Sequence, residues 1–351
     1  DAEEGVQSQS ETVWRQADKY GVPRLAFINK LDRTGADFVA VLNEIRKRLG
    51  VKAVALQMPW GREDTFTGMV DLVTMKSLKF DSANPTNPPE VGEIPSELKD
   101  AAETYRHDLI EAVAEHDDKL MEKYIHDQMP TEDELRAGIR NATIETALAV
   151  QAGHKDHALF VPVLCGASFR NIGAQPLLDA ICDYLPSPLD VPIPTAHDPF
   201  NPEQTIACSP DEQAPLAALA FKIMSDPYVG KLTFIRVYSG VLKAGETIHN
   251  ASKRRKERIS KLVRMHANKQ ELVDEIKAGD IGAAVGLKET STGETICYED
   301  KPLLFERIQF PEPVIAMYIE PKSKVEQDRL ANALGRLQDE DPTFRVHYNQ
   351  E

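Results

Sequence analysis

Apolar and polar residues in the first fifty positions follow the spacing of helices and strands in turn. Ser8–Tyr20 has a helical pattern that ends at Gly21 and Pro23. Residues 24–28 form a short apolar run, which is typical of a strand buried in a parallel sheet. Apolar side chains then recur at helical spacing over residues 38–49. This alternation predicts an α/β domain.

A different pattern occupies residues 55–157. A hairpin-like stretch comes first, followed by a loop over residues 81–95 that is rich in proline and asparagine. Long acidic helices are expected over residues 96–125 and again from Thr131–Glu134, whose spacing is that of a capping box at a helix start. We interpret residues 55–157 as an insertion into the α/β domain.

The α/β pattern resumes after the insertion. An apolar run over residues 159–165 predicts a second buried strand, and residues 176–185 have the pattern of a helix. The inner side of that helix is expected to carry Leu177, Leu178, Ile181 and Leu185. Residues 1–54 and 158–190 together form the predicted α/β domain.

Prolines and short strands characterise the second half of the chain. Prolines are dense over residues 185–215, and we interpret residues 191–213 as a linker. Residues 214–310 contain short strands separated by turns with glycine, which predicts a small β-barrel. The expected strands include residues 232–238, 259–265 and 281–287.

Residues 311–351 begin another unit. Strands are expected over residues 314–319 and 344–348, on either side of a helix that begins at the capping-box sequence Ser323–Glu326. Two strands and one helix rarely close a core alone. We therefore expect these residues to be the start of a larger α+β domain.

Composition narrows the class of protein. The chain has 351 residues, 42% of them hydrophobic, and a formal net charge of −15, so contact with a nucleic acid requires a local basic patch. No apolar run approaches the roughly 18 residues of a membrane helix. The four cysteines lie far apart, which argues against a zinc site or a secreted disulfide framework and favours the cytoplasm. His154 and His157 lack further zinc ligands, so we expect them to face solvent.

The sequence Asn29-Lys30-Leu31-Asp32 directly follows the first predicted strand. The Asp32 carboxylate can accept two parallel hydrogen bonds, from the ring N–H and the exocyclic amino group of guanine, a pair of donors that adenine lacks. The Asn29 amide can donate to N7 of the base, and the stem of Lys30 can lie over the base plane. The alternative is an ordinary polar turn. The preceding strand and the following helix favour a guanine-binding loop.

A second loop follows the second predicted strand. Gly166, Ala167 and Ser168 are small residues whose backbone N–H groups can face the carbonyl oxygen of the base. In a parallel α/β sheet the two loops lie together, because ligands bind at the carboxyl ends of the strands. A turn of small residues after a strand is common, so this loop alone is a weak indication. We refer below to the Asn29 loop (residues 29–32) and the Ser168 loop (residues 166–168).

Longer stretches of the chain resemble the elongation factor G family of translational GTPases. In family order, the stretches that carry the resemblance are residues 5–20, 29–33, 165–166, 183–188 and 232–240. The resemblance implies the later part of a P-loop-type GTPase domain with its insertion, then the translation-factor β-barrel, then the start of a ferredoxin-like α+β domain. It also implies GTP or GDP with Mg²⁺ as ligands of the intact parent.

The chain contains no Gly-x-x-x-x-Gly-Lys-Ser/Thr phosphate loop, and we assign no stretch as the Asp-x-x-Gly switch. The resemblance implies that these elements precede Asp1 in an intact parent. We therefore expect the chain to be an internal fragment that hydrolyses no GTP and binds no nucleotide tightly. The Ser168 loop also reads Gly-Ala-Ser where the family usually has Gly-Ser-Ala, which displaces the hydroxyl and weakens the case for a side-chain role of Ser168.

Two charged sets are candidate contact surfaces. The basic cluster, which can contact RNA phosphates locally or be a solvated hairpin, consists of Lys253, Arg254, Arg255, Lys256 and Arg258. The acidic set, whose spacing places it on one face of a helix, consists of Glu111, Glu115, Asp118 and Glu122. The alternative for the acidic set is an ordinary soluble surface. The resemblance implies contact of the barrel with ribosomal RNA of the small subunit, and of the insertion with the stalk protein of the large subunit.

Together these features predict a fragment of a monomeric, cytoplasmic GTPase that, when intact, drives translocation of transfer and messenger RNA on the ribosome. A recycling paralogue and a release-factor-3-like GTPase are alternatives within the superfamily, although residues 12–17 favour elongation factor G over the latter. Two alternatives belong to other classes of protein. One is a natural ribosome-binding module that does not hydrolyse GTP, and the other is a metabolic enzyme that binds guanine through the same loop.

Overall fold

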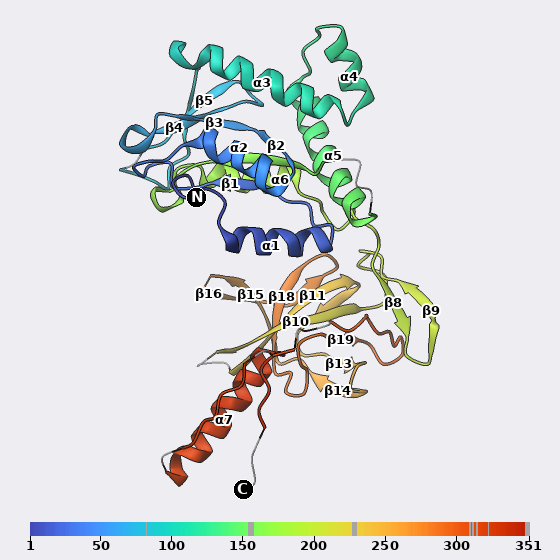
Figure 1. Cartoon of the computed structure of the whole chain (residues 1–351). Helices are drawn as coiled ribbons and strands as arrows, with labels where there is room; N and C mark the ends of the chain where they lie inside the picture. The colour runs from blue at the N-terminus through green and yellow to red at the C-terminus, as the bar shows by residue number, and fades with distance from the viewer. Residues whose placement is uncertain are drawn as a thin grey trace. The chain divides into compact units, whose positions relative to one another are not determined.

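Two compact units make up the chain: unit 1 is Asp1–Pro186 and unit 2 is Ser187–Glu351. Figure 1 labels their helices and many of their strands. The computed structural model describes residues 1–81, 83–153, 158–226, 230–267, 269–308, 310, 312–313, 315–321 and 323–347. The pair His154 and His157 therefore lies outside the described residues. In the part of the chain that is described, no helix combines the length and the apolar character needed to cross a membrane.

A three-stranded parallel sheet lies at the centre of unit 1. Its order is β1 (Ala26–Ile28), β7 (Phe160–Cys165) and β2 (Lys52–Ala55). Every residue of the middle strand β7 is buried, which explains why its sequence is continuously apolar rather than alternating. Ile28 pairs with Cys165, so β1 and β7 end at the same edge of the sheet.

Helix α2 (Phe38–Leu49) packs against β1 and β2. The Asp37 side chain caps its start by accepting a hydrogen bond from the Ala40 N–H at 2.9 Å. Gly50 ends it with φ of 65°, in the left-handed region that favours glycine. Helix α1 (Ser8–Lys19) also agrees with the predicted range.

Helix α6 (Ala174–Tyr184) exists as predicted, but its predicted inner face is only partly right. Leu177 packs against the core of unit 1, as predicted. Ala180 and Tyr184 are the buried residues, whereas Leu178 is 62% exposed and Ile181 is 42% exposed. Residues 180 and 184 are four apart and define one helical face. Leu178 lies roughly half a turn away from that face. The apolar pattern therefore did not identify the whole buried face of α6.

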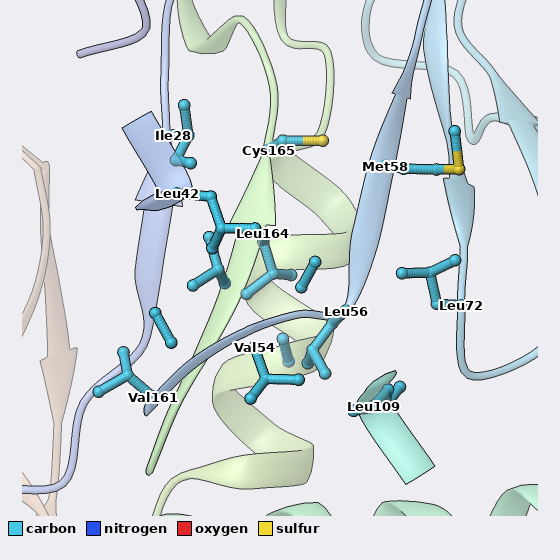
Figure 2. Close-up of a cluster of buried hydrophobic side chains, with 14 of the residues drawn as sticks. Ile28, Leu42, Val54, Leu56, Met58, Leu72, Leu109, Val161, Leu164 and Cys165 are labelled. Carbon is cyan, nitrogen blue, oxygen red and sulfur yellow. The ribbon is translucent and has the colours of Figure 1, made fainter. Parts of the chain in front are cut away.

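The insertion shares one hydrophobic core with the sheet of unit 1. Figure 2 shows part of this core, in which Leu56, Leu72 and Leu109 of the insertion lie with Val54 and Leu164 of the parallel sheet. The insertion contains a four-stranded antiparallel sheet in the order β3 (Gln57–Trp60), β4 (Gly68–Asp71), β5 (Lys76–Lys79) and β6 (Glu90–Gly92). Strand β6 lies inside the predicted loop over residues 81–95.

The helices of the insertion are α3 (Lys99–Ala114), α4 (Asp118–Ile125) and α5 (Glu132–Gln151). The single helix predicted over residues 96–125 is wrong, because Asp117 accepts hydrogen bonds from the N–H groups of Lys119 and Leu120 and begins a new helix. The capping box at the start of α5 is confirmed. Thr131 N–H donates to the Glu134 carboxylate at 2.8 Å, and Glu134 N–H donates to the Thr131 hydroxyl at 3.2 Å. Short 3₁₀ turns occupy Glu63–Thr65, Ser96–Leu98 and Ser168–Arg170.

Unit 2 is built on an eight-stranded antiparallel sheet. In sheet order its strands are β14 (Arg255–Arg258), β13 (Thr247–Asn250), β19 (Glu294–Cys297), β10 (Ala217–Asp226), β11 (Gly230–Ser239), β18 (Ile281–Val285), β15 (Lys261–His266) and β16 (Lys269–Val273). The short strands β12 (Val241–Lys243) and β17 (Glu275–Lys277) pair separately. One core contains side chains from several strands of this sheet, as in a β-barrel. These strands are β10, β11, β13, β15, β18 and β19.

The proline-rich segment is more ordered than the predicted linker over residues 191–213. It forms a hairpin of β8 (Thr195–Asp198) and β9 (Asn201–Ala207). The prolines are tolerated because they lie at strand ends and in β9, which pairs with β8 alone in a two-stranded sheet. His197 exchanges backbone hydrogen bonds of 2.8 and 2.9 Å with Leu304, and this segment contributes to the core of unit 2.

In the last residues of the chain, helix α7 (Lys324–Glu340) begins at Ser323, whose side chain accepts from the Glu326 N–H. The strands predicted on either side of it are absent from the described parts, residues 315–319 and 344–347. A strand needs a partner for its backbone groups, and no strand pairs with these segments within the described residues. The predicted strand ends Val314 and Tyr348 lie outside the described residues.

Candidate guanine-nucleotide site

The Asn29 loop and the Ser168 loop meet at the carboxyl ends of β1 and β7. The backbone brings them together, because Gly166 N–H donates to the Ile28 carbonyl at 3.0 Å and Leu31 N–H donates to the Gly166 carbonyl at 3.2 Å. Leu31 anchors its loop in the core with 2% of its surface exposed. The polar residues on either side of Leu31 are thereby held at the edge of the sheet where α/β proteins bind ligands.

The Asn29 side chain joins the two loops. Its amide N–H donates to the Ser168 hydroxyl at 2.9 Å, and its amide oxygen accepts from the Ser168 N–H at 2.9 Å and the Lys30 N–H at 2.8 Å. The sequence interpretation assigned Asn29 to the base and discounted the Ser168 side chain. The structure shows that both side chains hold the loops together, and one amide hydrogen of Asn29 remains for a base.

The backbone N–H groups of the Ser168 loop are not free to meet a base. Gly166 donates to Ile28 at 3.0 Å and Ala167 donates to the Ile172 carbonyl at 2.9 Å. Ser168 donates to the Asn29 amide oxygen at 2.9 Å. In this conformation the three groups already have partners within the protein, so their expected contact with the carbonyl oxygen of guanine stays a prediction. Satisfied backbone donors instead make the loop rigid.

Lys30 is held by a residue that sequence reasoning missed. The Lys30 ammonium lies 2.5 Å from the carboxylate of Asp1, and the Ala2 N–H donates to the Asn29 carbonyl at 2.8 Å. Lys30 has φ of 69°, a backbone conformation that is uncommon outside glycine. Local spacing gives no signal for the Asp1 contact, because Asp1 is distant in sequence from the loop.

Among the polar residues of the Asn29 loop, Asp32 has the side chain that remains available to a ligand. Its side chain is partly exposed, and the described residues give its carboxylate no hydrogen-bond or ion-pair partner. Glu63, which lies outside the loop, holds the backbone on either side of Asp32. Glu63 N–H donates to the Leu31 carbonyl at 2.9 Å, and Gly35 N–H donates to the Glu63 carboxylate at 2.8 Å. The arrangement leaves an oriented carboxylate beside two rigid loops.

The thiol of Cys165, at the base of the Ser168 loop, is not a nucleophile. It is fully buried, and burial raises the pKa of this thiol far above its usual range. Its backbone N–H donates to the Gln57 side chain at 3.2 Å. The residue therefore fixes the loop start and takes no part in bond formation.

The pattern Asp-x-x-Gly does occur in the chain, at Asp18–Gly21 and at Asp32–Gly35, but neither stretch has the setting of a switch. Asp18 lies in the last turn of α1 and pairs with Arg24 at 2.8 Å. Gly21 follows the helix with φ of 58°. The second match lies within the turn after β1.

Most of the basic cluster is paired with carboxylates. Lys253 lies 3.0 Å from Glu294, Arg255 lies 3.7 Å from Glu289 and Lys256 lies 2.6 Å from Glu299. Arg258 donates to the Gly245 carbonyl at 3.1 Å. The side chains of the cluster remain largely exposed, but their charge is partly neutralised, which weakens the simple electrostatic case for RNA.

The acidic set does not lie on one helix. Glu111 belongs to α3, Glu115 follows its end, and Asp118 and Glu122 belong to α4. The predicted single face is wrong because the Asp117 cap separates the two helices. Glu115 is also used within the fold, since its carboxylate lies 2.5 Å from the Lys52 ammonium. Beside this set, ligand atoms of the exposed residues His107, Asp108 and Glu111 lie within 4.8 Å of one another, an arrangement that is common without a metal.

Comparisons with known proteins agree with this fold. The family described as Elongation factor Tu GTP binding domain matches residues 1–187, and Elongation factor Tu domain 2 matches residues 230–297. The chain therefore belongs to the translational GTPases, the family that the GTP-binding domain of elongation factor Tu represents. Within this class it is elongation factor G-like, because Elongation Factor G, domain III, matches residues 310–351 after the other two.

A solved structure resembles this one over the whole chain. The crystal structure of a protein from Thermus thermophilus is 27% identical to this chain, with a TM-score of 0.76. The match covers 100% of this chain and 47% of that one. The chain thus spans about half the length of this relative.

Proposed function

We propose that unit 1 of this chain carries the guanine-specificity loops of a ribosomal translocation GTPase. The observation that carries this proposal is the Asp32 carboxylate, without a partner in the described structure, at the carboxyl ends of two parallel strands whose loops Asn29 joins. Asp32 would accept the ring N–H and the amino group of guanine. The stem of Lys30, fixed by Asp1, would cover the base plane.

The chain alone would bind guanine nucleotides weakly. The three backbone N–H groups of the Ser168 loop are occupied, and the sequence has no phosphate loop of the Walker type. The base contacts that remain are one carboxylate, one amide hydrogen and one lysine stem. We expect a Kd of about a millimolar, which corresponds to roughly 4 kcal/mol of binding free energy. In the intact parent, GTP or GDP with Mg²⁺ would gain its further affinity from phosphate contacts.

The test compares bases and changes Asp32 alone. Saturation-transfer NMR on the chain should show guanosine diphosphate binding and no comparable binding of adenosine diphosphate. Asp32→Asn should reverse the preference toward xanthosine diphosphate, because an amide donates to the carbonyl that xanthine has in place of the amino group of guanine. Equal signals for guanine and adenine, or no signal with either, would refute the proposed site.

We further propose that phosphoryl transfer depends on residues outside this chain. Added to GTP, the chain should release phosphate at the rate of buffer alone, because its sequence has no phosphate loop of the Walker type to hold the transferred group. The control is Asp32→Asn prepared in the same way. A rate above background that the Asp32 substitution abolishes would contradict this proposal, whereas a rate equal in both proteins indicates a contaminating GTPase.

The proposed partners are ribosomal. The basic cluster of unit 2 would contact ribosomal RNA, and the acidic residues of α3 and α4 would contact a basic stalk protein. Family membership supports ribosome contact in general. Charge reversal at Glu122 in the full-length protein should weaken stalk-dependent stimulation. We expect less effect from Glu115, because the Lys52 ion pair already engages its carboxylate. Unchanged stimulation in both variants would refute the stalk contact.

A further inference from the structure

The turn of the β8–β9 hairpin places an exposed aromatic ring beside the basic cluster of the same unit. Phe200 lies in this turn with 77% of its surface exposed. The Arg254 guanidinium, from the turn before β14, lies 6.0 Å from the centroid of the Phe200 ring. Figure 1 labels the two hairpins, β8–β9 and β13–β14, in unit 2. We propose that Phe200 and Arg254 form a stacking site for an unpaired RNA base, an inference that rests on the RNA contact proposed above.

Arg254 differs from its neighbours in the basic cluster. Within the run Lys253–Lys256, the described residues offer a carboxylate partner to every cation except Arg254. Its recorded contact is the face of the Phe200 ring. Its charge is therefore available to a phosphate, whereas the charges on either side of it are partly neutralised.

The backbone of Arg254 also points to a specific role. Its φ is 56°, a left-handed conformation that a residue with a long side chain rarely adopts. The Asn250 side chain fixes the turn by accepting a hydrogen bond from the Lys253 N–H at 3.0 Å, and Asn250 is itself fully buried. Strained residues of this kind persist where the surrounding structure imposes them, and they are frequent at ligand-binding sites.

Phe200 is presented by an equally fixed turn. Its N–H donates to the Asp198 carboxylate at 2.8 Å, so that carboxylate is directed to the backbone. Pro199, immediately before it, restricts the chain further. A rigid ring with a cation over one face can stack an unpaired base on its other face while the cation meets a phosphate, and proteins bind single-stranded nucleic acid through such rings and cations. A base within a duplex is already stacked and cannot use this site.

The experiment measures RNA binding by the full chain through fluorescence anisotropy. The probes are a short labelled single-stranded RNA and a duplex of the same sequence, each at low and at physiological salt. Phe200→Leu keeps an apolar side chain and removes the ring, while Phe200→Trp keeps a stacking surface. The matched control is Phe169→Leu, the same change at a ring that is 101% exposed and for which the structure records no cation.

Phe200→Leu should raise the Kd for single-stranded RNA about 5- to 150-fold, the factor expected for one stacked base. The Kd for the duplex should not change. Phe200→Trp and Phe169→Leu should bind both probes like the unsubstituted chain. Arg254→Gln should reduce the salt dependence of binding by about one phosphate contact. Circular dichroism should show unchanged folding, since both rings are exposed.

The RNA contact of unit 2 and the stacking site at Phe200 can be refuted separately. If neither RNA binds the unsubstituted chain, the RNA contact of unit 2 is refuted together with the stacking site. If Arg255→Gln with Lys256→Gln weakens binding of both probes while Phe200→Leu has no effect, the RNA contact stands and the stacking site is refuted. A loss on Phe200→Leu that is equal for single strand and duplex also refutes stacking.

Discussion

Asn29→Ala should destabilise unit 1 even though no nucleotide is present. The substitution removes three hydrogen bonds, one to the Ser168 hydroxyl at 2.9 Å, one from the Ser168 N–H at 2.9 Å and one from the Lys30 N–H at 2.8 Å. Each such bond contributes roughly 0.5–1.5 kcal/mol net. The site is open to water, which can replace part of the loss, so we expect a destabilisation of about 1–2 kcal/mol.

Tryptophan fluorescence during urea unfolding can measure this change. Both tryptophans of the chain, Trp14 and Trp60, belong to unit 1, so their emission does not report on unit 2. Ser168→Ala removes only one of the three bonds and should cost less than Asn29→Ala. Asn29→Asp should be the mildest, because a carboxylate still accepts from both N–H groups and the Ser168 hydroxyl can rotate to donate to it.

The order of the three variants is the decisive result. If Asn29→Ala unfolds at the same urea concentration as the unsubstituted chain, the hydrogen bonds between the loops contribute nothing. If Ser168→Ala costs as much as Asn29→Ala, the hydroxyl rather than the amide holds the loops, and the assignment of roles would be wrong. A change in the slope of the transition would instead indicate that unit 1 no longer unfolds in one step.

Three further changes test the fold that supports the site. A Cβ at Gly138 would lie 2.5 Å from Val113 Cγ1 and 2.6 Å from Leu120 Cδ1, so Gly138→Val should lower the unfolding free energy by about 1–3 kcal/mol in the same fluorescence assay. Thr131→Ala breaks the capping box of α5 and should cost about 1 kcal/mol; no change in the urea midpoint would contradict this. In native protein only Cys182 should react rapidly with Ellman's reagent, because the other thiols are buried and burial raises their pKa; two fast thiols would contradict this.

The sequence predicted the elements whose signals are local. Helix α2 lies where its apolar spacing and Gly50 placed it, and α5 begins at the predicted capping box. The predicted helix over residues 96–125 failed because the cap at Asp117 is one short side chain within a continuous acidic pattern. The strands predicted near residues 315–319 failed for a different reason, since a strand depends on a partner that local pattern cannot supply.

The candidate site was likewise predictable from sequence only where its signals are local. The Asn29 loop was found from residue chemistry, and its place at the end of β1 follows from the apolar run before it. The Asp1 contact with Lys30 and the support of Glu63 for the loop could not be found, because each joins residues far apart in sequence. The pairing of the basic cluster with carboxylates was missed because the carboxylates lie in and around β19, far from the cluster in sequence.

The hydrogen bonds within the two loops have a consequence for how the site works. Since the loops satisfy each other's polar groups, they need no base to form, and a nucleotide loses little free energy in ordering them. For the same reason the loops offer few unused donors to the base. In the proposed site, discrimination would then fall on Asp32, whose carboxylate would be left desolvated and unpaired by adenine. The proposed site would therefore confer selectivity at low affinity, and in the proposed intact parent most of the binding free energy would come from phosphate contacts.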